Sequence, residues 1–328
     1  MDSGNIDAPL PQIYGATLPP REAARQHKRA FQPLHLRPRR KILNTMTNTL
    51  LSIGHGYSAQ ALADRLLPQG WQIIGTTRSP QKAGELATRG IKALIWPDAP
   101  LPLGQATHLL SSVAPRDGDP VLDAIGEHLV GAGHLKWVGY LSTVGVYGDQ
   151  RGGWVDEDTP PNAVSDRAIA RVTAEAAWQD ICARAGIRLH IFRLAGIYGP
   201  GRGPFEKLRS GRAQRIIKPD QYFSRIHYED IGQALELAIN SDIGTRIFNL
   251  CDDHPAPPQD VLEHAAKLLG LDPPPEVSFE QADISPMARS FYADSKRVRN
   301  TRIKRELGLQ LHYPDYQSGL ASILKAEG

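Results

Sequence analysis

The stretch NTLLSIGHGYSAQALADRLLPQG, residues 48–70, decides the fold. An apolar run at 48–53 leads into GHGYSA at 54–59, and the segment that follows repeats apolar residues at the spacing of an amphipathic helix. A strand, a glycine-rich turn and a helix in this order are typical of a βαβ unit that binds a dinucleotide. A glycine-rich turn without a ligand is the alternative, but the surrounding pattern favours a binding site.

Three residues of the turn have separate predicted roles. Gly54 allows the sharp bend, Gly56 lets a pyrophosphate approach the backbone, and Ala59 is small enough for the helix to pack closely on the strand. The N-terminus of the helix offers free N–H groups and a partial positive charge to phosphates. We therefore predict cofactor contacts from Gly54, Gly56, Tyr57, Ser58 and Ala59.

The end of the second predicted strand, WQIIGTT at 71–77, bears on the choice of cofactor. An NAD site places an acid about 20 residues past the glycines, on the ribose hydroxyls. Here the sequence continues with Arg78 and Ser79, and a guanidinium can bind a 2′-phosphate through two hydrogen bonds. NADP is therefore favoured over NAD, the alternative being an exposed arginine that opens the next helix. Ser112 and Ala114, at the end of a later strand, complete the predicted cofactor contacts.

The rest of the pattern extends this unit into a sheet. Further strands are predicted at 91–96, 107–115 and 136–143, with a helix over roughly 119–131. The alternation predicts an α/β fold, a doubly wound parallel sheet with a smaller C-terminal substrate lobe. The predicted dinucleotide-binding lobe comprises 46–200 with a returning segment at about 226–256, and the predicted substrate lobe comprises 201–225 and 257–328.

Composition narrows the class of protein. The 328 residues are 41% hydrophobic and 22% charged, without the run of about 18 apolar residues that a membrane span needs. Cys182 and Cys251 form no CxxC pair, and the eleven histidines show no metal-ligand spacing. We therefore expect a cytoplasmic protein that binds neither a metal nor a membrane.

The net charge of +3 is unevenly distributed. Residues 1–45 carry eight Lys and Arg against three Asp and Glu, whereas the remainder has 30 basic and 32 acidic residues. The body is therefore not a basic nucleic-acid binder. Because 1–45 is rich in Pro and Arg and lacks periodicity, we predict a disordered leader there, or a start assigned upstream of the true one at Met46.

Six motifs follow one another between about residue 47 and the end of the chain: GHGYSA, LSTVGVYG, VDEDTPP, RLAGIYGPGRGPF, FSRIHYEDIGQAL and FNLCDDHPAP. In these motifs the sequence resembles the extended and atypical short-chain dehydrogenases, the NAD(P)-dependent epimerase/dehydratase-like family. The resemblance implies a Rossmann fold, a nicotinamide cofactor, a small-molecule substrate and, as a suggestion, a homodimer.

The same resemblance implies catalytic positions. The family's Ser or Thr, three residues before the Val of VYG, corresponds to Thr143, and its Tyr-x-x-x-Lys pair falls on Arg167 and Arg171. Arginine stays protonated and cannot relay a proton, although Arg171 could hold the ribose or a phosphate. Tyr147 and Tyr198 are candidates for a substitute acid, and a packed structural aromatic is the alternative for each.

The segment SDRAIARVTAE, 165–175, raises a further question. Arg167 and Arg171 share a helix face whose continuation is apolar, so we expect both to point inward at the ligand crevice, where two cations need an anion. A cofactor phosphate or an anionic substrate is one candidate. An internal carboxylate, from Glu175 or from the loop WVDEDTP, is an equal alternative.

The substrate side of the sequence is basic. Between 201 and 230, Arg202 and Arg225 stand inside the family-like motifs and are the predicted substrate contacts, together with Arg167. The predicted function is that of an NADP-binding oxidoreductase or epimerase-like protein with a degenerate YxxxK pair. Its substrate would be a small polar, anionic carbonyl or sugar-type molecule. The alternative is a catalytically silent NADP-binding sensor or partner-binding protein on the same fold.

Overall fold

A seven-stranded parallel sheet is the centre of the computed structural model, which describes residues 47–327 and so leaves the predicted leader at 1–45 outside. The strand order is β11-β7-β5-β4-β1-β2-β3, and every pairing is parallel. The strands are β1 (Thr49–Ile53), β2 (Gln72–Thr77), β3 (Lys92–Ile95), β4 (His108–Ser111), β5 (Trp137–Thr143), β7 (Arg188–Leu194) and β11 (Arg246–Leu250). The predicted doubly wound parallel sheet is therefore confirmed.

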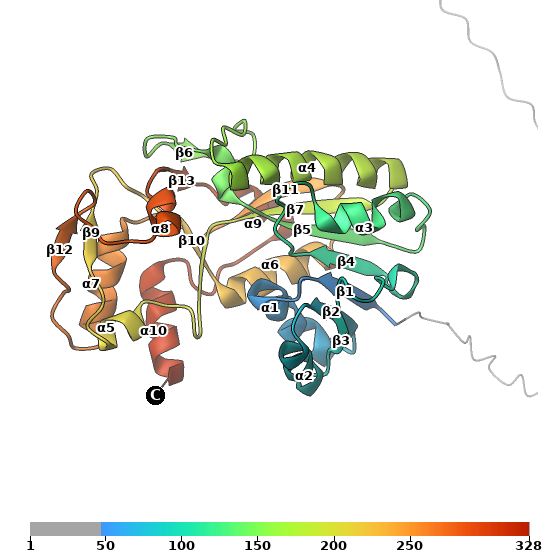
Figure 1. Ribbon diagram of the computed structural model, residues 1–328, viewed down its shortest axis with the longest axis horizontal. Helices are drawn as coiled ribbons and strands as arrows, with labels where there is room; N and C mark the ends of the chain where they lie inside the picture. Colours follow the sequence, from blue (N-terminus) through green and yellow to red (C-terminus); the bar gives the residue numbers. More distant parts are fainter. Residues whose placement is uncertain (1–46, 328) are drawn as a thin grey trace, which may run out of the picture. The chain divides into compact units, whose positions relative to one another are not determined.

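Helices cover both faces of the sheet, as Figure 1 shows. One apolar layer joins α1 (Tyr57–Leu66), α2 (Pro80–Thr88) and α6 (Tyr228–Asn240) to the sheet. The opposite layer contains α3 (Pro120–Leu129) and α4 (Asp166–Ala185). The sheet is thus buried on both sides, which is why its strands are short runs of consecutive apolar residues rather than alternating ones.

Local signals set the bounds of α4 and its packing. The hydroxyl of Ser165 accepts the N–H of Ala168 at its start, and Gly186 ends the helix in the left-handed conformation. Its Trp178 is fully buried and donates its indole N–H to Asp119 at 2.8 Å, the residue that also caps α3. One buried carboxylate therefore ties the two helices of this face together.

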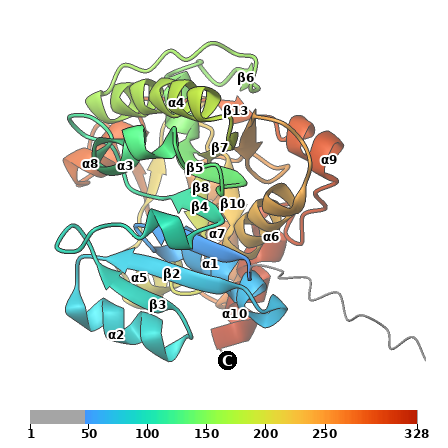
Figure 2. The same ribbon diagram turned by 90° about the vertical axis from the view of Figure 1, so that its right-hand side faces the viewer.

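A second set of elements builds its own small core beside the carboxyl edge of the sheet. The helices that form this core are α5 (Phe205–Arg209), α7 (Pro258–Leu268) and α10 (Tyr316–Glu327). The same part of the chain includes α8 (Pro286–Phe291) and also α9 (Thr301–Leu307), whose Ile303 packs into the core of the central sheet. Short parallel pairs accompany them: β6 (Trp154–Val155) with β13 (Arg297–Val298), β8 (Gly196–Tyr198) with β10 (Arg225–His227), and β9 (Arg215–Ile217) with β12 (Glu276–Ser278). Residues of α5, α7 and α10 share one apolar cluster. Figure 2 shows the same elements from the side.

The crevice for a ligand follows from the strand order. The chain moves outward from β1 through β2 to β3, then crosses back to β4 on the other side of β1. In open parallel sheets the ligand lies at the carboxyl ends of the strands where the order reverses, which here is between β1 and β4. None of the helices described within 47–327 is long and apolar enough to cross a membrane.

Three buried histidines, His108, His190 and His227, make the fold sensitive to acid. Burial lowers the pKa of each to about 4. His190 shows the reason most clearly, because its Nδ1 accepts the indole N–H of Trp137 at 3.0 Å while its Nε2 faces the carbonyls of Ile243 and Gly244. Only the neutral ring satisfies both contacts.

We predict that stability falls as the pH drops from about 6.5 towards 4. In that window the unfolded chain takes up protons on these histidines and the native chain does not, so each contributes a loss of up to about 3 kcal/mol. A His190→Gln variant should lose less unfolding free energy than the wild type between pH 7.5 and 4.5, as measured by urea titration. The exposed His128→Gln is the matched control, and an equal loss in both variants would contradict the argument.

Candidate functional site

The turn after β1 is locked in the shape that a glycine permits. Gly54 has a φ of +73°, and its N–H donates to the hydroxyl of Thr76 at 2.8 Å. A Cβ on Gly54 would stand 2.8 Å from the Val113 side chain. The bend therefore depends on glycine for both its conformation and its space.

The N-terminus of α1 is open above this turn. Gly56 is its N-cap residue, no side chain caps the helix, and no acidic residue stands in the first turn. A Cβ on Gly56 would meet only the Gly54 carbonyl, at 3.6 Å, so the space beyond it is free of protein. Unpaired N–H groups at a helix N-terminus with room in front of them suit a phosphate.

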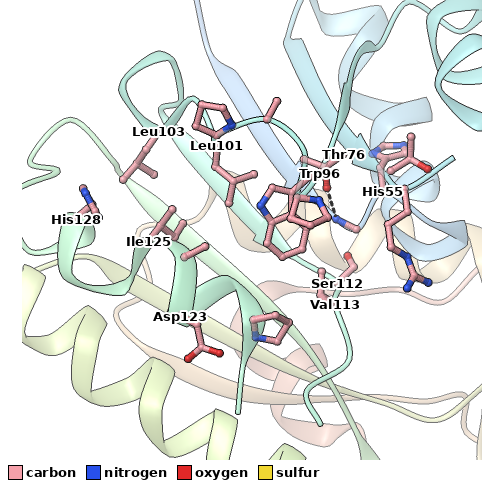
Figure 3. A pocket seen from close by; sticks show the side chains of 18 of the residues that line it. His55, Thr76, Trp96, Leu101, Leu103, Ser112, Val113, Asp123, Ile125 and His128 are labelled. Atoms are coloured by element: carbon pink, nitrogen blue, oxygen red, sulfur yellow. Dashed lines mark hydrogen bonds between the residues drawn. The ribbon is translucent and has the colours of Figure 1, made fainter. Parts of the chain in front are cut away.

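A cavity of about 1550 Å³ lies at this point of the sheet. It brings together six of the predicted cofactor contacts, namely Gly54, Gly56, Arg78, Ser79, Ser112 and Ala114. Figure 3 shows Trp96 in the middle of the cavity, with His55 and Thr76 to one side and Leu101, Leu103 and Ile125 to the other. The cavity thus has a polar half beside the glycine turn and an apolar half against α3.

The polar half is cationic where a ribose would be expected. Arg78 follows β2 directly, is exposed and forms no ion pair within residues 47–327, and Lys82 lines the same wall. The hydroxyl of Ser79 is engaged with the backbone, since it accepts the N–H of Lys82 and caps α2. The hydroxyl of Ser112 is buried and has no hydrogen-bond partner among the described residues.

The other three predicted contacts on α1 are placed differently. Ala59 is fully buried against the sheet, the close packing expected of it. Ser58 is partly exposed. Tyr57 turns away from the cavity: its hydroxyl donates to the carbonyl of Pro200 at 3.0 Å, and its ring lies 4.5 Å from that of Tyr228.

Thr143 and Arg171 both lie at β5, the strand that neighbours β4 in the sheet. Thr143 ends β5, is partly exposed, and its hydroxyl accepts the N–H of Gly145 at 3.1 Å. Arg171, on α4, donates through Nη1 to the hydroxyl of Tyr140 at 3.2 Å and to the carbonyl of Leu141. Its guanidinium is thereby held against the strand that carries Thr143.

The prediction that Arg167 also points inward was wrong. Arg167 is exposed, donates to the Ser290 hydroxyl at 3.1 Å, and lies 5.5 Å from the Phe291 ring of α8. The packed stripe of α4 includes Ala168 and Trp178, so Arg167 falls at its edge in the first turn. The two arginines therefore contact different elements: Arg167 contacts α8 and Arg171 contacts β5.

Neither Glu175 nor an acid of the loop WVDEDTP forms a hydrogen bond or ion pair with these arginines in residues 47–327; Asp158, for example, pairs with Arg302 at 2.5 Å. Glu175 pairs with Arg193 at 2.7 Å and accepts the hydroxyl of Ser142 at 2.5 Å, all inside the protein. Glu157, in the loop WVDEDTP, accepts the N–H of Asn249 at 2.8 Å. Two buried acids are thus fully used by the scaffold behind β5.

Tyr147 belongs to the same buried network and is badly placed to act as an acid. It has no exposed surface, its hydroxyl donates to Asn249 at 2.8 Å, and it accepts Arg193 at 3.0 Å. Burial raises the pKa of Tyr147 to about 12. Tyr198 is likewise buried and donates to the Asp315 carbonyl at 3.3 Å. Both are packed aromatics rather than free proton donors.

The three predicted substrate arginines do not converge. Arg167 contacts α8, as described, while Arg202 is exposed and lies 5.8 Å from the Tyr57 ring. Arg225, on β10, lines a second cavity of about 560 Å³ among α5, α7 and α10. Arg225 is the only one of the three that lines either of these two cavities.

Several lining residues escaped sequence reasoning. Thr76 fixes the turn from a neighbouring strand, Trp96 follows β3, and Tyr292 and Tyr316 line the second cavity. The position of Trp96 at the end of a predicted strand was a usable signal, because that edge faces the crevice. The tyrosines come from distant segments and carried no local signal.

Comparisons with known proteins agree with this geometry. Residues 119–251 match the NAD dependent epimerase/dehydratase family. Protein YeeZ of Escherichia coli (strain K12) is 28% identical over 280 residues, which is 80% of this chain and 95% of YeeZ. The solved structure of a functionally unknown conserved protein from Silicibacter pomeroyi DSS is 52% identical, covers 85% of this chain and 99% of its own, and superposes with a TM-score of 0.82.

More distant solved structures share the fold alone. MoeE5 in complex with UDP-glucuronic acid and NAD is 20% identical, with 85% of this chain and 98% of that one covered and a TM-score of 0.67. The human epimerase family protein SDR39U1, solved with NADPH, is 17% identical, with 84% and 99% covered and a TM-score of 0.64. With its Rossmann-like sheet and its matching sequence, the chain belongs to the NAD dependent epimerase/dehydratase family.

Proposed function

We propose that this chain is an NADP-dependent oxidoreductase or epimerase-like enzyme with an altered proton-transfer site, acting on a small anionic carbonyl or sugar-type substrate. The observation that carries the proposal is the large cavity at the strand reversal, with an open glycine turn at one end and Arg78 with Lys82 beside it. This cavity has the glycine turn, the free helix terminus and the cationic ribose end that NADP requires.

The residues present fit a dinucleotide. The space in front of Gly56 admits a pyrophosphate at the start of α1, and the unpartnered Ser112 hydroxyl offers a hydrogen bond on the opposite wall. Arg171, held beside β5, is available to the nicotinamide ribose or a phosphate. A nicotinamide cofactor would supply hydride transfer; the chain's part is to bind and orient it.

Arg78 supports NADP over NAD. It follows β2 at the position where an NAD site carries an acid, and its guanidinium forms no ion pair with any residue of 47–327. MoeE5 was solved with NAD and SDR39U1 with NADPH, so the relatives support a nicotinamide cofactor without favouring either form.

At the substrate end, Thr143 would orient a carbonyl or hydroxyl through its hydroxyl group. The usual acid is missing, since Arg167 and Arg171 replace the tyrosine and lysine and neither relays a proton at neutral pH. The hydroxyls of Tyr140, Tyr147 and Tyr198 are all buried and hydrogen bonded. The reaction would therefore draw its proton from the substrate or from water rather than from a tyrosine.

The same burial favours a second candidate, a protein that binds NADP and does not turn it over. On this alternative the cavity is a sensor or docking module, and Thr143 only caps the turn at Val144–Tyr147. Cytoplasmic location and a homodimer remain predictions of the sequence under either function.

Assay of NADPH oxidation against a panel of carbonyl compounds separates the two candidates. Consumption with at least one compound supports the enzyme. Tight NADPH binding with no consumption for any compound would establish the silent binder, and absence of NADPH binding would overturn both.

We predict that Arg78→Asp weakens NADPH binding by a factor of ten or more while NADH binding changes less than about threefold. The variant removes a charge-assisted contact worth about 2 kcal/mol and places a carboxylate near the 2′-phosphate. Fluorescence titration with both nucleotides measures this, and the exposed Arg89→Asp is the control. Equal losses for NADPH and NADH would refute the 2′-phosphate argument.

We further predict that Arg167→Tyr alone does not raise turnover. The new tyrosine would lack a lysine, because Arg171 stays bonded to Tyr140 and Leu141. Turnover in the NADPH assay should match that of the Arg167→Phe control, which has the same ring without the hydroxyl. A large gain specific to the tyrosine would show that the family's acid needs no lysine here.

A further inference from the structure

The second cavity has a chemistry of its own. It lies between α5, α7 and α10, away from the glycine turn, and encloses about 560 Å³, the size of a small-molecule site. Arg225 reaches it from β10, and Tyr198 from β8. Its walls come from four segments of the chain that are far apart in sequence.

Arg225 is the deepest charge in this cavity. Its Nη1 donates to the carbonyls of Phe223 and Ala256, at 2.8 and 3.1 Å, and this anchors the guanidinium. Its Nε and Nη2 donate no hydrogen bond to residues 47–327, and Arg225 forms no ion pair there. One edge of the guanidinium fork is therefore left for a ligand.

The carboxyl that acts most strongly on Arg225 is that of Asp252, which forms no ion pair with it. Asp252 is buried, its Oδ2 has no partner among the described residues, and burial raises its pKa to about 8. Arg225 is thus a half-buried cation that forms no ion pair within residues 47–327, an arrangement that an anion would relieve.

The charges around the mouth balance. Four charged side chains line it besides Arg225: Glu206, Lys207, Arg212 and Asp283. Arg212 lies 3.7 Å from Glu206. Two positive and two negative groups cancel, so the lining as a whole carries the single positive charge of Arg225.

The remaining walls are apolar and aromatic. Val261, Leu262 and Leu320 form one side, and Tyr292 and Tyr316 stand close to the arginine. Such walls suit a flat hydrocarbon body rather than a sugar with many hydroxyls, because each buried hydroxyl would need a partner.

We propose that this cavity binds a monoanionic carboxylate with a flat apolar body, its carboxylate on the free edge of Arg225. A planar carboxylate matches that edge with two hydrogen bonds, whereas a nucleoside diphosphate would bring two or more negative charges to a site with one net positive charge. The proposal rests on the proposed function in taking this ligand as the substrate, although its binding is testable without cofactor.

The topology brings this site close to Thr143. Thr143 pairs with Leu194 in the central sheet, and Arg225 pairs with Gly196 two residues further along the same chain. Two strand spacings and two residue rises put the two backbones at most roughly 16 Å apart. A carboxylate anchored at Arg225 can thus extend an aromatic or unsaturated chain towards the strand that carries Thr143.

The test compares 3-phenylpropanoate with 3-phenylpropanamide, its neutral isostere, by calorimetric titration of the full chain at pH 7, with UDP as a third probe. The carboxylate should bind at least ten times more tightly than the amide and more tightly than UDP. Equal binding of acid and amide, preference for UDP, or no binding of the acid would each overturn the proposal.

Two variants locate the binding. Arg225→Gln should abolish the preference for the acid over the amide. Arg225 also donates to the Phe223 and Ala256 carbonyls, so its replacement could disturb the fold, and Leu262→Phe provides a second test. This variant narrows the cavity and keeps the guanidinium, and it should lower the affinity for the acid at least fivefold. Arg305→Gln, an exposed arginine on α9 outside the cavity, is the control and should bind as the wild type does. Unchanged affinity in Leu262→Phe would place the ligand elsewhere.

NADPH titration of the same samples distinguishes the failure of this inference from that of the proposed function. If NADPH binds and the carboxylate preference is absent, only the assignment of the second cavity fails. If the carboxylate binds to Arg225 and NADPH does not bind, the cavity is a carboxylate site in a protein that is not an NADP enzyme.

Discussion

The bend at Gly54 is the constraint on which the site depends. Its positive φ turns the chain out of β1, and its N–H is held by the Thr76 hydroxyl of the neighbouring β2. That hydrogen bond connects the turn to the strand that Arg78 follows, so the phosphate end and the ribose end of the cavity are built as one unit. A side chain at Gly54 would press on Val113, beyond β4, and disturb the opposite wall. Both walls of the crevice therefore depend on the same residue.

Much of the scaffold could be predicted from the sequence, because its signals are local. The apolar run at Thr49–Ile53, the glycine turn and the helix after it lie within one short stretch, and parallel topology follows from repeating that unit. The short pairs β6–β13, β8–β10 and β9–β12 were not predicted. Each joins segments that are distant in sequence and only two or three residues long, so neither strand has a periodicity of its own.

Some residues of the candidate site could likewise be placed from the sequence and others could not. Gly54, Arg78 and Ser112, which follow strands of the sheet, line the cavity, as strand ends in a doubly wound sheet are expected to do. Thr143 also stands at a strand end but is not among the residues that line either cavity. The contacts of side chains on α4 were not predicted. Helical spacing shows which residues share a face, but it does not show which element packs against that face. Arg167 and Arg171 share a face by spacing, yet Arg171 bonds to β5 and Arg167 to α8. What decided between them was the presence of Ser290 and Phe291 over the first turn, which nothing in the helix itself encodes.

The buried pair Glu175–Arg193 supports the segment at the end of β5 that includes Thr143. The pair holds Ser142 on one side and Tyr147 on the other, so it supports both ends of the segment that includes Thr143. An uncompensated charge here would be costly, which ties the two residues to each other whatever the chemistry. The Glu175–Arg193 pair thus supports the framework around Thr143 independently of Arg167, and in addition to the hydrogen bonds that Arg171 makes with Tyr140 and Leu141. Because Arg167 contacts α8 and Arg171 contacts β5, the two arginines do not form one site, and the ligand proposed at Arg225 is the more informative guide to the substrate.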